Sequence, residues 1–203
     1  MSDKHVMGMS LFVASEFVFF AVLILAFVFY RQSPANIGGP TAFNSLDVPT
    51  TGFYTACLTA SSVTFWLAER SHRRNRTGQW HALLLVTILL GGAFIYGEGR
   101  EFADMSGQGI VPSTNLFGTT FYALVGFHGF HVAMGLIVLL TVFGISLRSR
   151  FFRGAAHARA IRTIAIYWIF VDAMWWIIFP TVYLWSLGNH GILGEPFKAV
   201  PFR

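Results

Sequence analysis

The sequence predicts an all-α, polytopic membrane protein: a bundle of five transmembrane helices forming a single membrane domain over residues 1–203. Composition is the first observation behind this prediction, because 55% of the residues are hydrophobic and only 11% are charged, far below the roughly 25% of soluble domains. The second is the grouping of the apolar residues into five segments. Each segment has at least the roughly 17 residues that a helix needs to cross the hydrocarbon core.

We expect the five helices at residues 6–30, 52–68, 80–97, 116–147 and 161–187. The first apolar run is longer than the roughly 7–15 residues of a secretory signal, and no small-residue cleavage site follows it, so we expect a mature helix. The fourth segment contains no Asp, Glu, Lys or Arg. The longest connection, residues 31–51, is rich in Pro and Gly, which favour turns.

Arginine is unevenly distributed among the connections. The second connection and the fourth one, with its borders, hold most of the arginines: Arg70, Arg73, Arg74, Arg76, Arg148, Arg150, Arg153, Arg159 and Arg162. The positive-inside rule places these two connections in the cytoplasm, so the N-terminus is predicted to be cytoplasmic and the C-terminus outside. Contact with membrane phospholipids accounts for the formal charge of +5, and we expect no nucleic-acid partner.

Two acidic residues fall near the middle of predicted helices, where a charge is costly, so both should face protein. Glu16 is either a protonatable group on or beside a proton or lipid path, or a carboxylic acid hydrogen-bonded for packing. Asp172 favours the packing interpretation. Trp168, Trp175 and Trp176 lie about one helical turn from it, and an indole N–H is a suitable donor to a buried carboxylate.

Two histidines, His128 and His131, lie three residues apart in the fourth helix and share a face. A metal or haem site would need further ligands, and no other histidine lies inside a predicted span. We therefore expect hydrogen bonds to Glu16, Asp172 or backbone carbonyls, with no catalytic, cofactor-binding or metal-binding residue in this chain. Three glycines of the same helix should allow close approach of a neighbour: Gly126, Gly129 and Gly135.

Charged residues also occur near the outer end of the third helix, where water should reach them. Glu98 and Glu101 are expected there as polar residues at the membrane interface, and Arg100 could pair with either. The chain has one cysteine, Cys57, so it forms no internal disulfide and no thiolate metal cluster.

Several blocks of the sequence resemble subunit III of the haem-copper respiratory oxidases, the family of cytochrome c oxidases and quinol oxidases. The resemblance covers nearly the whole chain. Its most specific block is Gly126-Phe127-His128-Gly129-Phe130-His131-Val132. The other blocks are residues 14–20, 46–49, 60–62 with Trp66, 100–102, 115–122 and 167–175.

The chain departs from the family pattern at a few positions. Ile169 stands where the family usually has histidine, so a hydrogen-bonding group is lost beside Asp172. Glu69 and Arg70 stand where a histidine pair often ends the second helix. The chain begins where the third helix of the seven-helix form would begin, and so it resembles the five-helix bacterial form.

The resemblance implies an accessory subunit that carries no haem, copper or catalytic centre. It would pack against the catalytic subunit I, which would hold the haem and copper, and against subunit II, in the plasma membrane of a bacterium. There it would support assembly and proton uptake, with phospholipids in its grooves. Glu16 would face the interior, and Glu101, His128, His131 and Asp172 would hold the bundle together.

Two alternatives remain open at this point. The first is a subunit III-like protein of a nitric oxide reductase, which the loss of histidine at Ile169 makes conceivable. The second is a small proton or ion transporter that uses Glu16 and Asp172. The sequence shows no internal repeat and no pair of Gly/Pro-broken half-helices of the kind many transporters use. An independent haem or metal enzyme built on His128 and His131 ranks last.

Overall fold

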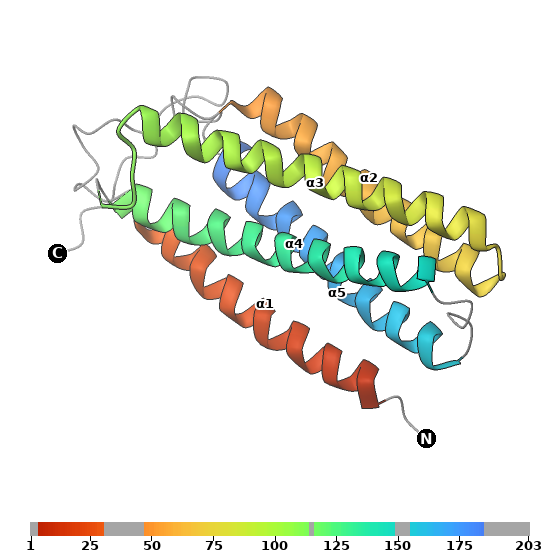
Figure 1. Ribbon diagram of the computed structural model, residues 1–203. Helices are drawn as coiled ribbons and strands as arrows, with labels where there is room; N and C mark the ends of the chain where they lie inside the picture. The colour runs from red at the N-terminus through yellow and green to blue at the C-terminus, as the bar shows by residue number, and fades with distance from the viewer. Residues whose placement is uncertain (1–3, 31–46, 114–115, 149–154, 185–203) are drawn as a thin grey trace.

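The computed structural model describes residues 4–30, 47–113, 116–148 and 155–184, and within them it contains the five expected helices and no strand. The helices are α1 (Lys4–Tyr30), α2 (Val48–Arg73), α3 (Thr77–Gly107), α4 (Leu116–Arg148) and α5 (Ala155–Phe179) (Figure 1). α5 continues into a π-helical turn, η3 (Pro180–Leu184). The prediction of an all-α helix bundle is confirmed. Most of the predicted first outer loop, and residues 185–187 of the fifth predicted helix, lie outside the described residues.

Two helices extend well beyond their apolar segments. α2 begins four residues earlier than expected because Asp47 caps it, accepting a hydrogen bond from the Thr50 backbone N–H at 3.2 Å, and because Pro49 suits the first helical turn. α3 continues to Gly107, about ten residues past its predicted end. Hydropathy marks where a helix leaves lipid, whereas the backbone hydrogen bonds of α3 continue into the polar region.

Among the described residues, four helices are long and apolar enough to cross a membrane: the spans are Val6–Tyr30, Thr77–Gly107, Leu116–Arg148 and His157–Leu184. The chain is therefore a multi-pass membrane protein. α2 does not reach the same hydropathy because hydroxyl residues line its buried face, including Thr51, Thr55 and Ser61. In α1, the apolar side chains of Leu11, Val18 and Leu25 are exposed at seven-residue spacing, which is a surface suited to lipid or to another membrane helix.

The helices run alongside one another as a bundle (Figure 1). α2 and α3 form a hairpin whose turn includes Asn75, a residue that tolerates its positive φ of 57°. α5 contacts α1, α2 and α4, and α4 also contacts α1 and α3. The start of α1, the α2–α3 turn, the end of α4 and the start of α5 lie at one end of the bundle.

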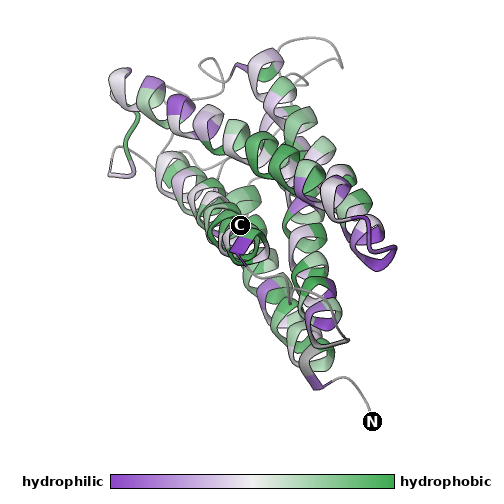
Figure 2. Ribbon diagram, turned by 45° about the vertical axis from the view of Figure 1, so that its right-hand side comes forward, coloured by the Kyte–Doolittle hydropathy of each residue, from purple (hydrophilic) through white to green (hydrophobic). Residues whose placement is uncertain are grey.

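Aromatic side chains fill the interior of the bundle. Trp80, Trp168, Trp175, Phe20 and Phe121 are at most 2% exposed. Apolar residues dominate the length of the helices, with hydrophilic residues concentrated towards their ends (Figure 2). Polar groups inside the bundle are therefore few, and their positions define the candidate functional site.

Candidate functional site

The central polar contact of the bundle joins α1 to α4. Glu16 Oε2 lies 3.1 Å from Nε2 of His131, and both side chains are largely buried, with 21% and 11% of their surfaces exposed. The prediction that a histidine of α4 would hydrogen-bond to Glu16 is confirmed for His131. Because the two residues lie within spans Val6–Tyr30 and Leu116–Arg148, the contact lies within the membrane-spanning part of the chain.

The second ring nitrogen of His131 determines the proton count of this pair. Nδ1 lies 2.7 Å from the carbonyl oxygen of Phe127, and a carbonyl oxygen only accepts, so Nδ1 carries a proton. In the neutral ring Nε2 is then an acceptor, and the hydrogen bond requires a protonated Glu16. In the charged ring Nε2 donates to the Glu16 carboxylate. In both arrangements one proton is shared between Glu16 and His131.

Neighbouring side chains fix the position of this pair. The Tyr167 hydroxyl of α5 donates to the backbone carbonyl of His131 at 2.9 Å, which joins a third helix to the site. The Phe20 ring lies edge-on to the His131 ring, with 5.1 Å between centroids, and covers it from α1. Phe20 is 1% exposed, so this side of the imidazole is shielded from solvent and lipid.

His128 has different surroundings, although it shares a face with His131. Its ring is completely buried and stacks on the Trp175 indole, with 4.8 Å between centroids and 26° between planes. Phe94 of α3 meets it edge-on at 5.9 Å. Neither ring nitrogen has a hydrogen-bond partner among the described residues. The expected hydrogen bonds of His128 to Glu16, Asp172 or a backbone carbonyl are therefore not formed in the described structure.

Glu98 is also buried, which differs from the expectation that it would meet water at the membrane interface. Its side chain packs against α4, where it occupies the space that a Cβ at Gly129 would need. Only 8% of the residue is exposed, and neither carboxylate oxygen has a hydrogen-bond partner among the described residues. Arg100 is exposed and forms no ion pair with Glu98 or Glu101, so the pairing suggested by the sequence is wrong.

Glu101 joins three elements towards the end of α3. It accepts hydrogen bonds from the Tyr183 hydroxyl of η3 at 2.7 Å and from the Thr51 hydroxyl of α2 at 3.4 Å. Tyr183 was not identified from the sequence. Pro180 offers the only sequence signal, because a proline lacks an N–H and disrupts an α-helix, and here the chain continues from it as a π-helical turn that contains Tyr183.

Three indoles of α5 link this helix to α2. Trp168 donates to Ser61 at 3.2 Å, Trp175 to Thr55 at 2.8 Å and Trp176 to Thr59 at 3.0 Å. The expectation that an indole would donate to Asp172 is therefore wrong.

Hydroxyls suit the indoles because each can accept from the indole while donating to its own helix; Thr55, for instance, donates to the Thr51 carbonyl. Asp172 faces the same helix, near the hydroxyls of Thr59 and Ser62. Ile169 is 51% exposed, so the position where the family usually has histidine points away from this interior.

A metal site needs several ligating side chains close together. In the described ranges, no three side chains of His, Cys, Asp or Glu form a group that could hold a metal ion. The Glu16–His131 pair supplies two such side chains. The two side chains share a proton across a hydrogen bond inside the helix bundle.

Comparisons with known proteins define the class to which this bundle belongs. The family model of cytochrome c oxidase subunit III matches residues 2–187. Subunit 3 of the cytochrome bo(3) ubiquinol oxidase of Pseudomonas aeruginosa is 34% identical over 181 residues, covering 88% of this chain and 84% of that protein. Subunit 3 of human cytochrome c oxidase is 34% identical over 186 residues, covering 88% and 69%. A probable cytochrome c oxidase subunit 3 of Nocardia farcinica is 31% identical over 176 residues, covering 87% and 85%.

The matched chain is thus a subunit of a respiratory membrane complex. It belongs to the cytochrome c oxidase subunit III family, as the sequence blocks around Glu16, His128 and Asp172 indicated. Membership of this family implies a haem-copper oxidase complex in which other subunits accompany the chain.

Proposed function

We propose that this chain is the accessory subunit III of a bacterial haem-copper terminal oxidase and has no redox centre of its own. It assembles with the catalytic subunit I, which holds the haem and copper, and with subunit II, in the bacterial plasma membrane. Its role is to stabilise the assembled oxidase and to support proton uptake by the catalytic subunit. Family membership over residues 2–187 supports the assignment of the complex.

The observation that carries the proton-related role is the Glu16–His131 contact. The pair holds one proton between a carboxylate oxygen and an imidazole nitrogen 3.1 Å apart, in the interior of a helix bundle. Groups of this kind inside a membrane are costly to retain, and in many membrane proteins they take part in proton transfer. Glu101, His128 and Asp172 have a structural part in the proposal, since they hold the helices around this pair.

The proposed topology has five spans, with the N-terminus in the cytoplasm and the C-terminus outside. α2 has 26 residues, about 39 Å of helix, and lies along the spanning helix α3, so we include it as a span (Figure 1). The bundle end that contains the start of α1 and the α2–α3 turn carries most of the arginines of the described helices, which supports its cytoplasmic location.

Cysteine labelling tests this topology. Cys57→Ser removes the only cysteine, and Thr77→Cys or Gln108→Cys then places one thiol at either end of α3. A membrane-impermeant maleimide applied to intact cells should label the thiol at position 108 and leave that at position 77 unlabelled until the membrane is opened. The reverse pattern would overturn the orientation.

Proton uptake by the assembled oxidase tests the function. Glu16→Gln keeps a donor for His131, so the complex should still assemble. Because the variant lacks the exchangeable proton of the carboxyl group, the complex should take up protons more slowly. Glu69→Gln is the matched control, because the one ion pair of Glu69, with Arg73 at 3.7 Å, lies within α2 and joins no two helices. Unchanged proton uptake in the Glu16→Gln complex would overturn the proposed role of the pair.

A complex purified without the chain tests the accessory role more broadly. It should start turnover at a rate comparable with the complete oxidase and then lose activity sooner, because proton supply and assembly are less well supported. Equal rates and equal lifetimes with and without the chain would contradict the proposal.

A further inference from the structure

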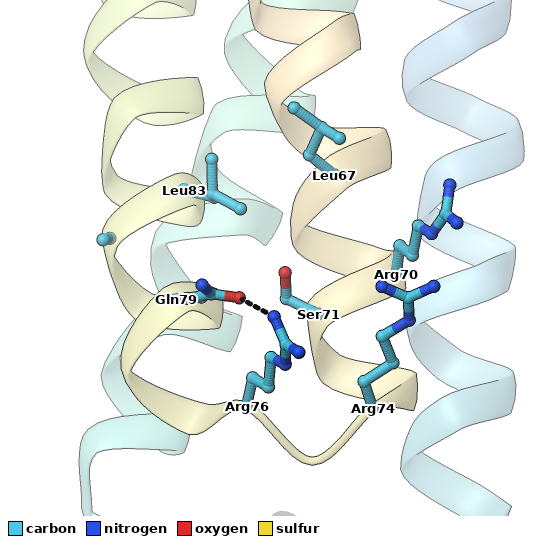
Figure 3. Close-up of a pocket in the computed structure, with 8 residues that line it drawn as sticks. Leu67, Arg70, Ser71, Arg74, Arg76, Gln79 and Leu83 are labelled. Carbon is cyan, nitrogen blue, oxygen red and sulfur yellow. Dashed lines mark hydrogen bonds between the residues drawn. The ribbon is translucent and has the colours of Figure 1, made fainter.

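A basic cavity lies at the turn between α2 and α3, far along the chain from the Glu16–His131 pair. The cavity measures about 440 Å³, which is within the range of roughly 300–1,000 Å³ for small-molecule sites. Its lining comes from the last turns of α2, the connecting turn and the first turns of α3 (Figure 3). The sequence predicted only the orientation of the chain and a general contact of its arginines with phospholipids, without a defined site.

Three arginines give this cavity its charge. Arg70, Arg74 and Arg76 line it, and no Asp or Glu lies among the lining residues. None of the three forms an ion pair with a described carboxylate. Arg73, in the same helical turn, behaves differently because its guanidinium lies 3.7 Å from Glu69 and it does not line the cavity. In the part of the chain that the structure describes, the charge of these three arginines is therefore not paired with a carboxylate.

Two further contacts prepare the arginines for an anion. Arg70 lies over the Trp66 ring at 5.7 Å from its centroid, an arrangement that leaves the edges of a guanidinium available to donate. Arg76 donates to Gln79 at 3.5 Å, which directs it towards the first turn of α3 (Figure 3). That turn has no side-chain cap at Arg76, and a helix N-terminus itself favours negative charge.

Besides the arginines, Ser71 and Gln79, the lining contains three apolar residues: Leu67, Ala82 and Leu83. Leu67 and Leu83 lie on the cavity side away from Arg74 and Arg76 (Figure 3), and Leu67 is 37% exposed. Trp66 is 47% exposed, and tryptophan is enriched where a membrane protein passes from hydrocarbon to headgroups. The cavity thus combines a cationic end with an apolar end, as an amphipathic ligand requires. A free phosphate would use only the cationic end.

We propose that this cavity binds an anionic phospholipid, with its phosphate held by Arg70, Arg74 and Arg76 and the start of its acyl chains on Leu67 and Leu83. The site holds one lipid at a defined place on the α2–α3 hairpin. The assignment of this lipid to the cytoplasmic leaflet rests on the proposed topology, whereas the site itself does not.

Native mass spectrometry of the complete complex tests the site. The oxidase complex that contains the full chain is delipidated and titrated with phosphatidylglycerol, with phosphatidylcholine, or with inorganic phosphate as competitor. Each arginine near a membrane surface contributes about a fivefold change in affinity, so Arg74→Gln should weaken phosphatidylglycerol binding about fivefold and the triple variant at least tenfold. Arg73→Gln, the matched control, should change it less than twofold.

Further arms separate the sources of the anion. Leu67→Gln keeps every arginine and should weaken phosphatidylglycerol while leaving phosphate binding unchanged. Unaltered phosphatidylglycerol binding in the triple variant would overturn the site. Equal affinity for phosphatidylcholine, or binding of phosphate without preference for the lipid, would overturn the lipid assignment.

Lipid retention is measured without reference to turnover or proton uptake. Failure of this site therefore remains distinguishable from failure of the proposed function. The single variant Arg74→Gln changes one exposed side chain, so the test stands even where the triple variant does not assemble.

Discussion

Replacing Glu16 by leucine removes one partner of the α1–α4 contact and leaves Nε2 of His131 without a hydrogen bond. Interhelical hydrogen bonds in membrane proteins contribute on average about 0.6 kcal/mol and at most about 1.7 kcal/mol. The 3.1 Å contact is enclosed by Phe20 and anchored by the bond from Nδ1 to Phe127, which places it above that average. We predict a coupling free energy of about 1 kcal/mol between Glu16 and His131.

A double-mutant cycle measures this coupling. Glu16→Leu, His131→Leu and the double variant of the full chain are unfolded reversibly in bicelles by increasing SDS, with tryptophan fluorescence as the readout. The coupling equals the departure of the double variant from the sum of the singles. About 1 kcal/mol corresponds to a fivefold change in the unfolding equilibrium constant.

Two controls sharpen the result. Glu16→Gln retains a donor for Nε2, so its free energy of unfolding should stay within about 0.5 kcal/mol of the parent chain. The 3.7 Å pair of Glu69 and Arg73, four residues apart in α2 with the Arg73 side chain 59% exposed, should show a coupling no larger than about 0.5 kcal/mol in the same cycle. Additive effects of Glu16→Leu and His131→Leu would refute the contact, as would a loss in Glu16→Gln equal to that in Glu16→Leu.

Three other substitutions test separate parts of the bundle in the same unfolding assay. Gly135→Ala should lower the free energy of unfolding by about 1–3 kcal/mol, because the new Cβ would lie 2.7 Å from the Trp168 ring; an unchanged value would contradict this packing. Tyr183→Phe should cost about 1–3 kcal/mol, because Glu101 loses its shorter hydrogen bond, whereas no loss would show that water replaces the hydroxyl. Asn75→Val should destabilise the α2–α3 turn, where φ is 57°, while Asn75→Gly should be tolerated; equal effects would refute the backbone argument.

Most of the helical architecture could be predicted from the sequence, because lipid excludes charge over a whole span. Residues 116–147, without a charged residue, correspond closely to α4 (Leu116–Arg148). The ends of α2 and α3 could not be placed in this way, since hydropathy reports the boundary of lipid and not the end of backbone hydrogen bonding. The Pro180 turn was also missed, because the apolar pattern does not distinguish an α-helical turn from a π-helical one.

The residues of the candidate site could be predicted from the sequence, but most of their contacts could not. Spacing placed His128 and His131 on one face, yet residues three apart differ by about 60° around the helix, so His131 reaches α1 while His128 meets Trp175. The indole N–H groups of α5 donate to hydroxyls and not to Asp172, because Thr55, Thr59 and Ser61 of α2 face α5. Which residues face α5 depends on how α2 is rotated about its own axis. Sequence spacing alone does not contain that rotation.

The central claim is membership of a working oxidase complex, and identification of the proteins that co-purify with the chain tests it most directly. The chain is extracted gently from its native membrane, and its partners are identified by mass spectrometry together with the haem absorbance of the preparation. The account predicts a large polytopic haem-copper oxygen reductase subunit, accompanied by subunit II. Recovery of a folded, stable chain without such a partner would contradict the account, and recovery with a nitric oxide reductase would contradict its assignment to oxygen reduction.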